Sequence, residues 1–262
     1  MLGLNAFSHD AAAALVVDGA LVFAAEEERY DRRKHSAAFP ARAIAAALAH
    51  AGLAPGDVDA VAFPWRRDMA RVRRALYVLR RLPRSLAFLK EAPRGLPGRL
   101  GHLRAVAALP RLLREIGIRA PVVHVDHHRA HAVQAWAFGP SDDAALLTAD
   151  GLGEWTATAT WRADADGPRL LRARGYPHSL GKVYAAVTEH LGFSPEADEG
   201  KTMGLAPYGT TREVDAFRRV LAPHPRDCYA IDPSAFAFPL GRARLAGAPF
   251  AARFGPPRPP EA

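Results

Sequence analysis

A repeated strand pattern constrains the fold of this chain more than any other feature. The first copy comprises apolar runs that predict strands at 2–7, 11–17 and 21–25, the last two joined by the hairpin turn Asp18-Gly19. The second copy comprises predicted strands at 144–149, 155–161 and 169–176, with the acidic turn Asp150-Gly151 after the first of them. Predicted helices alternate with further short strands, which favours an α/β fold built from two similar lobes.

Four segments follow from this pattern. We expect a first lobe at 1–140, a helical insertion within it at about 66–114, a partial second lobe at 141–232 and a Pro-rich, poorly ordered tail at 233–262. The insertion holds 14 Lys or Arg residues against two acidic ones, a net charge of +12, and its prolines predict several short helices. Because the whole chain carries +8, the remainder carries −4, and the positive charge is local.

Composition restricts the environment of the protein. A single cysteine, Cys228, excludes a disulfide framework within the chain and favours a reducing compartment. The N-terminus lacks a basic region before its apolar residues, and the longest apolar runs are far shorter than the roughly 20 residues that span a bilayer. We therefore expect a cytoplasmic protein with no membrane partner.

Three side chains predict a metal site. His127 and His131 are four residues apart on a predicted helix, so both imidazoles lie on one helical face. Asp150 follows a predicted buried strand and completes a set of two nitrogens and one oxygen of the kind that holds a transition metal. The alternatives are a surface helix that happens to be rich in histidine and an Asp-Gly turn that binds nothing.

Other polar positions are weaker candidates. His9 follows the first strand and is suited to acid–base or charge-stabilising work, or to a turn that bonds its own backbone. Lys34, in a basic run, is placed to contact a phosphate or carbonyl oxygen. The Gly-rich segment 199–209 lacks the first glycine of a phosphate loop, so it predicts either nucleotide binding through backbone amides near Lys201, Gly204 and Gly209 or a tight connection between helices.

Taken together, these motifs resemble the O-carbamoyltransferases of nodulation-factor and antibiotic biosynthesis. The matching segments are Gly3-Leu4-Asn5 to His9-Asp10, Glu26-Glu27-Glu28-Arg29 to Phe39-Pro40, Asp126-His127-His128-Arg129-Ala130-His131, Asp150-Gly151, Ser179-Leu180-Gly181 and Glu199-Gly200-Lys201 to Gly209. The resemblance covers roughly residues 2–221, with a loose match in the basic insertion.

The resemblance implies an actin-like, ribonuclease-H-like fold of two lobes, the second one incomplete, similar to the tRNA threonylcarbamoyl-transferring proteins. It implies that His127, His131 and Asp150 ligate a divalent metal of the iron type, and that His9 and Lys34 lie near the carbamoyl group. The donor would be carbamoyl-adenylate, made from carbamoyl phosphate and ATP, with Mg²⁺, by a C-terminal domain that this sequence does not contain. The acceptor would be the hydroxyl of a small molecule such as a sugar or an antibiotic.

Because members of that family are about twice as long, we expect the chain by itself not to make carbamoyl-adenylate. Two alternatives keep parts of this interpretation. In one, the acceptor is a tRNA adenosine and the basic block holds the phosphate backbone, although the block lacks interleaved aromatic residues and nucleic acid is the less favoured partner. In the other, the chain is an inactive fragment that binds a metal or a nucleotide.

Overall fold

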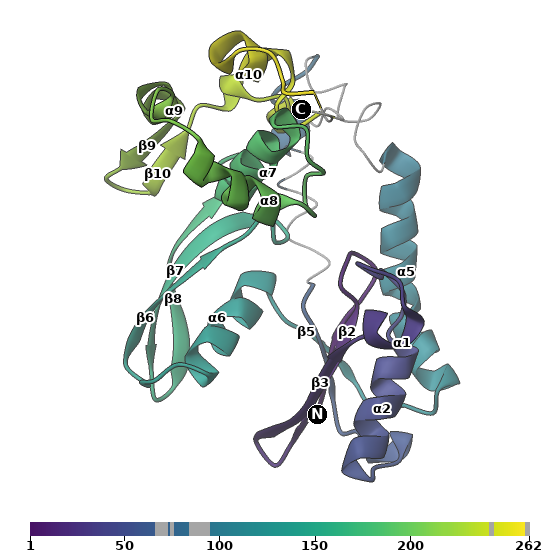
Figure 1. The fold of residues 1–262 in the computed structure, drawn as a ribbon. Helices are drawn as coiled ribbons and strands as arrows, with labels where there is room; N and C mark the ends of the chain where they lie inside the picture. Colours follow the sequence, from purple (N-terminus) through teal and green to yellow (C-terminus); the bar gives the residue numbers. More distant parts are fainter. Residues whose placement is uncertain (66–72, 74–75, 84–94, 241–243, 260–262) are drawn as a thin grey trace. The chain divides into compact units, whose positions relative to one another are not determined.

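The computed structural model describes residues 1–65, 73, 76–83, 95–240 and 244–259 (Figure 1). The chain divides into two compact units. Unit 1 comprises Met1–Arg66 and Leu96–Asp126, and unit 2 comprises Arg67–Gly95 and His127–Ala262. Each unit contains its own β-sheet, so the predicted α/β class with two lobes is confirmed.

Unit 1 is built on a mixed five-stranded sheet with the strand order β3-β2-β1-β4-β5. The strands are β1 (Leu2–Asn5), β2 (Ala12–Val17), β3 (Ala20–Glu26), β4 (Val61–Phe63) and β5 (Val122–His124). The first three form an antiparallel meander, and β4 and β5 run parallel to β1. Asp18 and Gly19, which join β2 to β3, both have positive φ, as the predicted tight hairpin requires.

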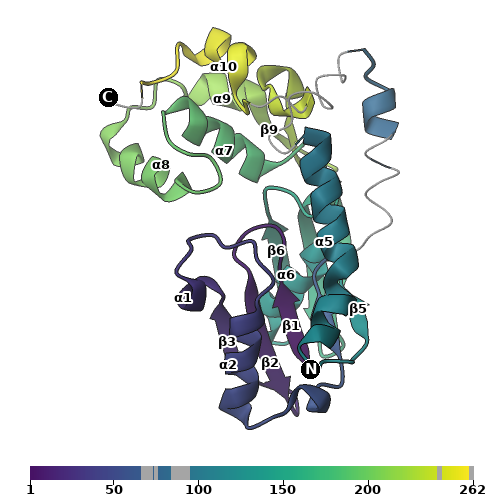
Figure 2. The same cartoon turned by 90° about the vertical axis from the view of Figure 1, so that its right-hand side faces the viewer.

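One face of this sheet carries the core of unit 1. Alternate residues of the strands, such as Leu2, Leu4 and Leu15, are buried, because successive side chains of a strand point to opposite faces. Helices α2 (Ala41–Ala51) and α5 (Gly95–Glu115) contribute to the same core cluster (Figure 2). The short helix α1 (Glu28–Asp31) and the 3-10 turn η1 (Pro55–Asp57) complete the unit.

The basic block at 66–114 differs from the predicted insertion. Its second half is the single helix α5, which continues through Pro110, and its first half lies largely outside the described residues. Val106, Leu109 and Leu113 recur on one side of α5 and are buried in the core of unit 1, whereas the arginines at 104, 111 and 114 are exposed. Burial of this apolar stripe offsets the hydrogen bond that Pro110 cannot donate, so the helix is not broken there.

Unit 2 begins with a helix and repeats the meander of unit 1. Helix α6 (His127–Ala137) precedes the antiparallel sheet β6-β7-β8, formed by β6 (Ala144–Ala149), β7 (Thr156–Asp164) and β8 (Gly167–Gly175). The helix packs on this sheet through Ala132, which lies in a cluster with Ala159 and Trp161. The predicted lobe boundary at 140 is therefore too late: α6 belongs to the second unit, because its buried face is complementary to β6 and β7.

The rest of unit 2 is mainly helical. Its elements are α7 (Leu180–His190), α8 (Glu199–Leu205), η3 (Ala206–Tyr208), α9 (Val214–Val220), β9 (Leu221–His224), β10 (Cys228–Ile231), η4 (Pro233–Ala235), η5 (Phe238–Leu240) and α10 (Gly247–Phe254). No helix in the described part of the chain is both long enough and apolar enough to cross a membrane.

Residues 233–240 and 244–259 are ordered, where the sequence predicts a poorly ordered tail. Phe236, Phe238 and Phe250 are buried in the main core cluster of unit 2. Pro233 opens η4 at a first-turn position, where its missing N–H has no partner to lose. The prolines therefore shape short turns between buried aromatic anchors. Only residues 241–243 and 260–262 of the predicted tail lie outside the described part.

Candidate metal centre

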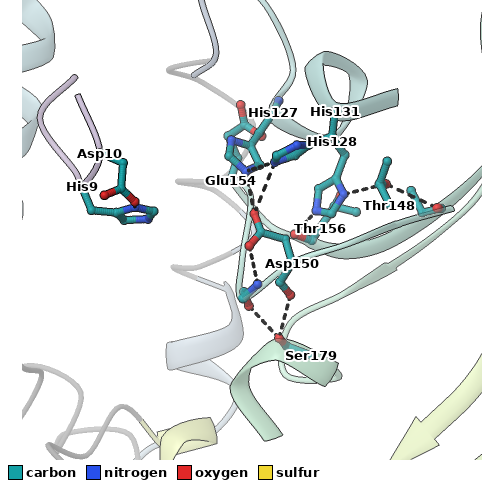
Figure 3. Close-up of polar contacts among 12 residues, drawn as sticks. His9, Asp10, His127, His128, His131, Thr148, Asp150, Glu154, Thr156 and Ser179 are labelled. Carbon is teal, nitrogen blue, oxygen red and sulfur yellow. Dashed lines mark hydrogen bonds and ion pairs between the residues drawn. The ribbon is translucent and has the colours of Figure 1, made fainter. Parts of the chain in front are cut away.

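Two elements of unit 2 carry the predicted metal ligands. His127 and His131 lie one turn apart on α6, whose neighbouring face, with His128 and Ala132, is buried. Asp150 directly follows β6, at the end of a strand that pairs with β7. The helix and the strand end therefore bring two imidazoles and a carboxylate together from sites 23 residues apart in sequence (Figure 3).

The three side chains converge tightly. Nε2 of His127 lies 2.6 Å from Oδ2 of Asp150, and Nε2 of His131 lies 3.2 Å from Nε2 of His127 and 3.8 Å from Oδ2 of Asp150. One ligand atom from each of the three lies within 4.8 Å of the others, and no other such set occurs among the described residues. The structure therefore brings together the three residues that the sequence selected.

This geometry fits a divalent transition metal. Three donors each about 2.1 Å from one ion are about 3.0–3.4 Å from one another, for octahedral or tetrahedral angles. The observed separations of 2.6, 3.2 and 3.8 Å bracket that range, so small side-chain movements suffice. Two imidazole nitrogens and one carboxylate oxygen on one face are the donor set of non-haem iron sites and also suit zinc.

The turn that carries Asp150 is fixed by α7. Ser179 caps this helix by accepting a hydrogen bond from the amide of Lys182, and its hydroxyl lies 2.6 Å from the carbonyl oxygen of Gly151. Gly181 lets the helix approach this closely, since a Cβ there would lie 2.7 Å from the amide nitrogen of Gly151. The carboxylate of Asp150 also accepts a bond from the Gly151 amide at 2.6 Å. The ligand turn is thus held by contacts on both sides.

His128 is a structural residue between the two neighbouring histidines. Its Nε2 lies 2.9 Å from the carbonyl oxygen of Thr156, which only accepts, so Nε2 carries a proton. Its Nδ1 lies 2.8 Å from the Thr148 hydroxyl, which also donates to the carbonyl oxygen of Ala159 at 3.3 Å. The same hydroxyl oxygen accepts from the indole of Trp161 at 3.1 Å. This buried network fixes the rotation of α6 about its axis, and with it the direction of His127 and His131.

Local charges favour the ligating forms of the site. A hydrogen bond with His127 lowers the pKa of Asp150 far below its usual range, and burial of the carboxylate opposes the shift only in part. Burial, followed by the charge of His127, lowers the pKa of His131 below its ordinary value. At neutral pH, Asp150 is therefore ionised and His131 is neutral, which are the states that bind a cation.

The predicted residues His9 and Lys34 lie in unit 1 and are joined by a hydrogen-bonded chain. Asp10 contacts Nδ1 of His9 at 2.7 Å with one oxygen and Nδ1 of His35 at 2.9 Å with the other. Glu28 accepts from the His35 amide at 3.1 Å and from Nζ of Lys34 at 3.3 Å. Both predicted side chains are largely exposed at the ends of this chain.

Burial raises the pKa of Asp10, but hydrogen bonds with His9 and His35 outweigh it and the net shift is downward. A hydrogen bond from the His35 amide lowers the pKa of Glu28. Both carboxylates are therefore anionic at neutral pH and hold the basic residues around them. The sequence singled out His9 and Lys34, which end this hydrogen-bonded series, but it did not single out His35 or Glu28, which connect them.

The Gly-rich segment does not form the loop considered from the sequence. Residues 199–205 form helix α8, followed directly by η3, and Gly209 ends that turn. Nζ of Lys201 lies 2.9 Å from a carboxylate oxygen of Asp198, the residue before the helix. The segment lies beside α7, and the hydroxyl of buried Thr202 is hydrogen bonded to that of Thr188 at 3.0 Å. The segment is therefore a helix followed by a 3-10 turn, and nucleotide binding near Lys201, Gly204 and Gly209 stays a prediction.

Two features near the metal centre were missed from the sequence. A carboxylate oxygen of Glu154 lies 3.5 Å from the amide nitrogen of His127, at the start of α6. Gly153 packs against the histidines so closely that a Cβ there would lie 2.8 Å from the ring of His128. The signal was present in the turn Gly151 to Trp155, which has an acidic residue and two glycines, but nothing in the sequence shows that it folds over α6.

Residues 1–235 match the family described as Carbamoyltransferase N-terminus. The chain belongs to this family. An uncharacterized protein of Synechocystis, sll1178, is 36% identical over 228 residues, which cover 82% of this chain and 35% of that protein. The nodulation protein NolNO of Sinorhizobium fredii is 33% identical over 211 residues, covering 78% of this chain and 28% of NolNO. This carbamoyltransferase N-terminal chain thus spans about a third of the length of these relatives.

Among solved structures, YeaZ from Pseudomonas aeruginosa is a distant likeness. It is 16% identical, has a TM-score of 0.38, and the comparison covers 67% of this chain and 66% of that chain. The resemblance to carbamoyltransferases that the spaced motifs predicted is confirmed by the family match, which spans the metal ligands and both strand meanders.

Proposed function

We propose that this chain is the metal-binding part of a carbamoyltransferase that moves a carbamoyl group from carbamoyl-adenylate to the hydroxyl of a small molecule. The convergence of His127, His131 and Asp150 carries the proposal. Membership of the carbamoyltransferase N-terminal family supports the type of group transferred. The adenylate donor, an iron-type metal and a small-molecule acceptor rest on the motif resemblance.

The ligand side chains perform separable tasks in this proposal. Asp150 supplies a permanent negative charge, because its hydrogen bonds keep it ionised. His127 and His131 would supply imidazole nitrogens from a helix whose rotation is fixed by His128. When bound, the metal would act as a Lewis acid on the carbamoyl oxygen, which makes the carbonyl carbon more electrophilic.

The hydrogen-bonded chain in unit 1 is proposed to act on the carbamoyl donor. Lys34 would place a positive charge against a phosphate or carbonyl oxygen. His9 would accept or donate a proton through the ring nitrogen that does not face Asp10. Asp10 is a positioning residue in this scheme, since it contacts the rings of both His9 and His35.

The parts of the reaction that precede transfer are proposed to reside elsewhere. The formation of carbamoyl-adenylate from carbamoyl phosphate and ATP, with Mg²⁺, would belong to a C-terminal domain of the longer relatives. Incubation of this chain with both compounds is therefore expected to release no pyrophosphate or phosphate above background. ATP-dependent release of either product would contradict this division of labour.

Metal binding is the direct test of the site. The purified chain is stripped of metal with a chelator and titrated anaerobically with Fe²⁺, and separately with Zn²⁺, by calorimetry. We expect one ion per chain. His127→Ala, His131→Ala and Asp150→Asn should each weaken binding by about tenfold or more, because each removes one of three ligands.

Matched controls separate ligation from general effects. His50 is an exposed histidine on α2, and Asp142 is an exposed aspartate before β6. His50→Ala and Asp142→Asn should leave the affinity unchanged. Equal affinities in the ligand variants and these controls would reject the metal centre, and with it the proposed role of this site.

A further inference from the structure

A cavity of about 840 Å³ lies within unit 2, remote in sequence from the metal ligands. Its wall is mostly apolar and includes Tyr77, Phe236 and Pro239. Arg80 and Arg81 also line it, and the described lining residues include no carboxylate. A volume of this size suits a small organic ligand, for which pockets of about 300–1,000 Å³ are usual.

The apolar wall is held by Tyr77, which lines the cavity, and by Tyr176, which packs against Tyr77. The hydroxyl of Tyr77 donates to the carbonyl oxygen of Pro239 at 2.9 Å, and that of Tyr176 donates to the carbonyl oxygen of Phe238. The rings of Tyr77 and Tyr176 meet edge to face, with centroids 5.2 Å apart. The cavity wall is thus built across helical residues 76–79 and the ordered tail, with its phenol groups already hydrogen bonded.

The two arginines give the cavity its polarity. The guanidinium of Arg81 lies 3.8 Å from the centroid of the Tyr77 ring, a cation–π contact that holds the charge beside the apolar wall. Both arginine side chains are exposed, so their donors reach a ligand at the mouth. A guanidinium presents its donors in a planar fork that matches a carboxylate, phosphate or sulfonate.

We propose that this cavity binds a small amphipathic anion: a ring system against Tyr77 and Phe236, with one anionic group on Arg80 and Arg81. The site is independent of the proposed carbamoyl transfer, because none of its lining residues is a metal ligand. It also gives the first part of the basic block a task that needs no nucleic acid, since two arginines beside an apolar cavity suit one small anion better than a phosphate backbone.

The test uses two probes that differ in one charged group. The anion 8-anilinonaphthalene-1-sulfonate and the neutral N-phenyl-1-naphthylamine share their rings, and both fluoresce when they leave water. We expect the anion to bind at one principal site per chain. The double variant Arg80→Ala with Arg81→Ala should weaken binding of the anion about tenfold and change the neutral probe about twofold or less.

Two further variants keep this result specific. Arg218 and Arg219 form an equally exposed adjacent pair on α9, away from this cavity, so their double alanine variant should leave both affinities unchanged. Ser234→Trp places a large ring at the cavity from an exposed position and should reduce binding of both probes about tenfold. The site would be rejected if the two arginine pairs had equal effects, or if Ser234→Trp left both affinities intact.

Discussion

Nε2 of His127 lies 2.6 Å from Oδ2 of Asp150, although the two residues are separated by a helix, a strand and the turns between them. The contact exists because α6 packs on β6 and β7, which places the first turn of the helix at the strand end. His131, one turn further along the same helix, adds the third donor. The proposed metal centre depends on a helix-to-sheet interface, so residues that set the interface should affect metal binding without contacting the ion.

Gly181 provides the first test of this dependence. A Cβ at Gly181 would lie 2.7 Å from the backbone nitrogen and 2.8 Å from Cα of Gly151, so Gly181→Ala pushes α7 away from the ligand turn. We expect a loss of about 1–3 kcal/mol in the free energy of unfolding in urea. The affinity for Zn²⁺ should also fall, measured by calorimetry, because Asp150 moves with the turn.

Gly200 is the matched control for this substitution. It lies in α8, and no heavy atom lies within 4 Å of an added Cβ. Gly200→Ala should leave metal affinity unchanged and raise stability by up to about 1 kcal/mol, because alanine favours the helix. If Gly181→Ala were as harmless as Gly200→Ala, the close contact between α7 and the ligand turn would be wrong.

Thr148 tests the buried network behind the histidines. Thr148→Ala leaves Nδ1 of His128 and the indole N–H of Trp161 without the hydroxyl that each of them contacts. We expect a loss of about 2–4 kcal/mol in unfolding free energy, since each buried group left unsatisfied costs about 1–3 kcal/mol. Thr211→Ala, at an exposed position, should change stability by less than about 0.5 kcal/mol. If the two variants lowered the free energy of unfolding equally in urea titrations, the structural role assigned to His128 would be wrong.

Phe250 tests whether the Pro-rich tail is part of the folded unit. The side chain is 2% exposed and packs with Phe236 and Phe217 in the core cluster. Phe250→Ala should reduce the free energy of unfolding by about 3–5 kcal/mol. Phe138→Ala, at a position 70% exposed, should have little effect. If the tail were poorly ordered, the two variants would have similar free energies of unfolding, and a protease would cleave the tail in the native protein.

Asp232 makes the stability of this tail dependent on pH. Its carboxylate accepts hydrogen bonds from the hydroxyl and amide of Ser234 and lies 2.8 Å from Arg253. These partners, the Ser234 hydroxyl first, lower the pKa of Asp232. A lowered folded pKa means that the stabilisation is fully present above the unfolded value of about 3.9 and is lost as pH falls through the folded value.

Asp232→Asn should therefore be less stable than the native chain at pH 6, and the difference should shrink as pH falls through the lowered folded pKa of Asp232, because the native carboxylate is then protonated too. Urea midpoints measured from pH 2.5 to 6 would show this convergence. A difference that stayed constant over that range would mean that the charge of Asp232 does not contribute.

Much of the local structure was predictable because it depends on short-range rules. Asp18-Gly19 specified a hairpin through its tolerance of positive φ, and helix 41–51 was bounded by apolar periodicity and Gly52. The ligand pair His127 and His131 was predictable for the same reason, since helical spacing alone puts them on one face. Asp150 required one further assumption, that ligands gather at strand ends.

Other features required tertiary structure. Whether α5 was an insertion or a core helix depended on what lay opposite Val106 and Leu109, and the arginines around them obscured the apolar stripe. The Gly-rich segment 199–209 became a helix because Thr202 faces α7, a contact between segments distant in sequence. In the tail, the prolines suggested disorder, whereas the phenylalanines between them are buried in the core of unit 2.

The sequence by itself determined the strand meanders, the shared helical face of the proposed metal ligands and the family to which the chain belongs, because each follows from residue types at fixed spacing. Tertiary structure decided which helix covers which sheet, how Asp10 joins His9 to His35, and that Arg80 and Arg81 lie beside a cavity lined by the tail. These relationships depend on packing between segments far apart in sequence, and such packing leaves no periodic signal along the chain.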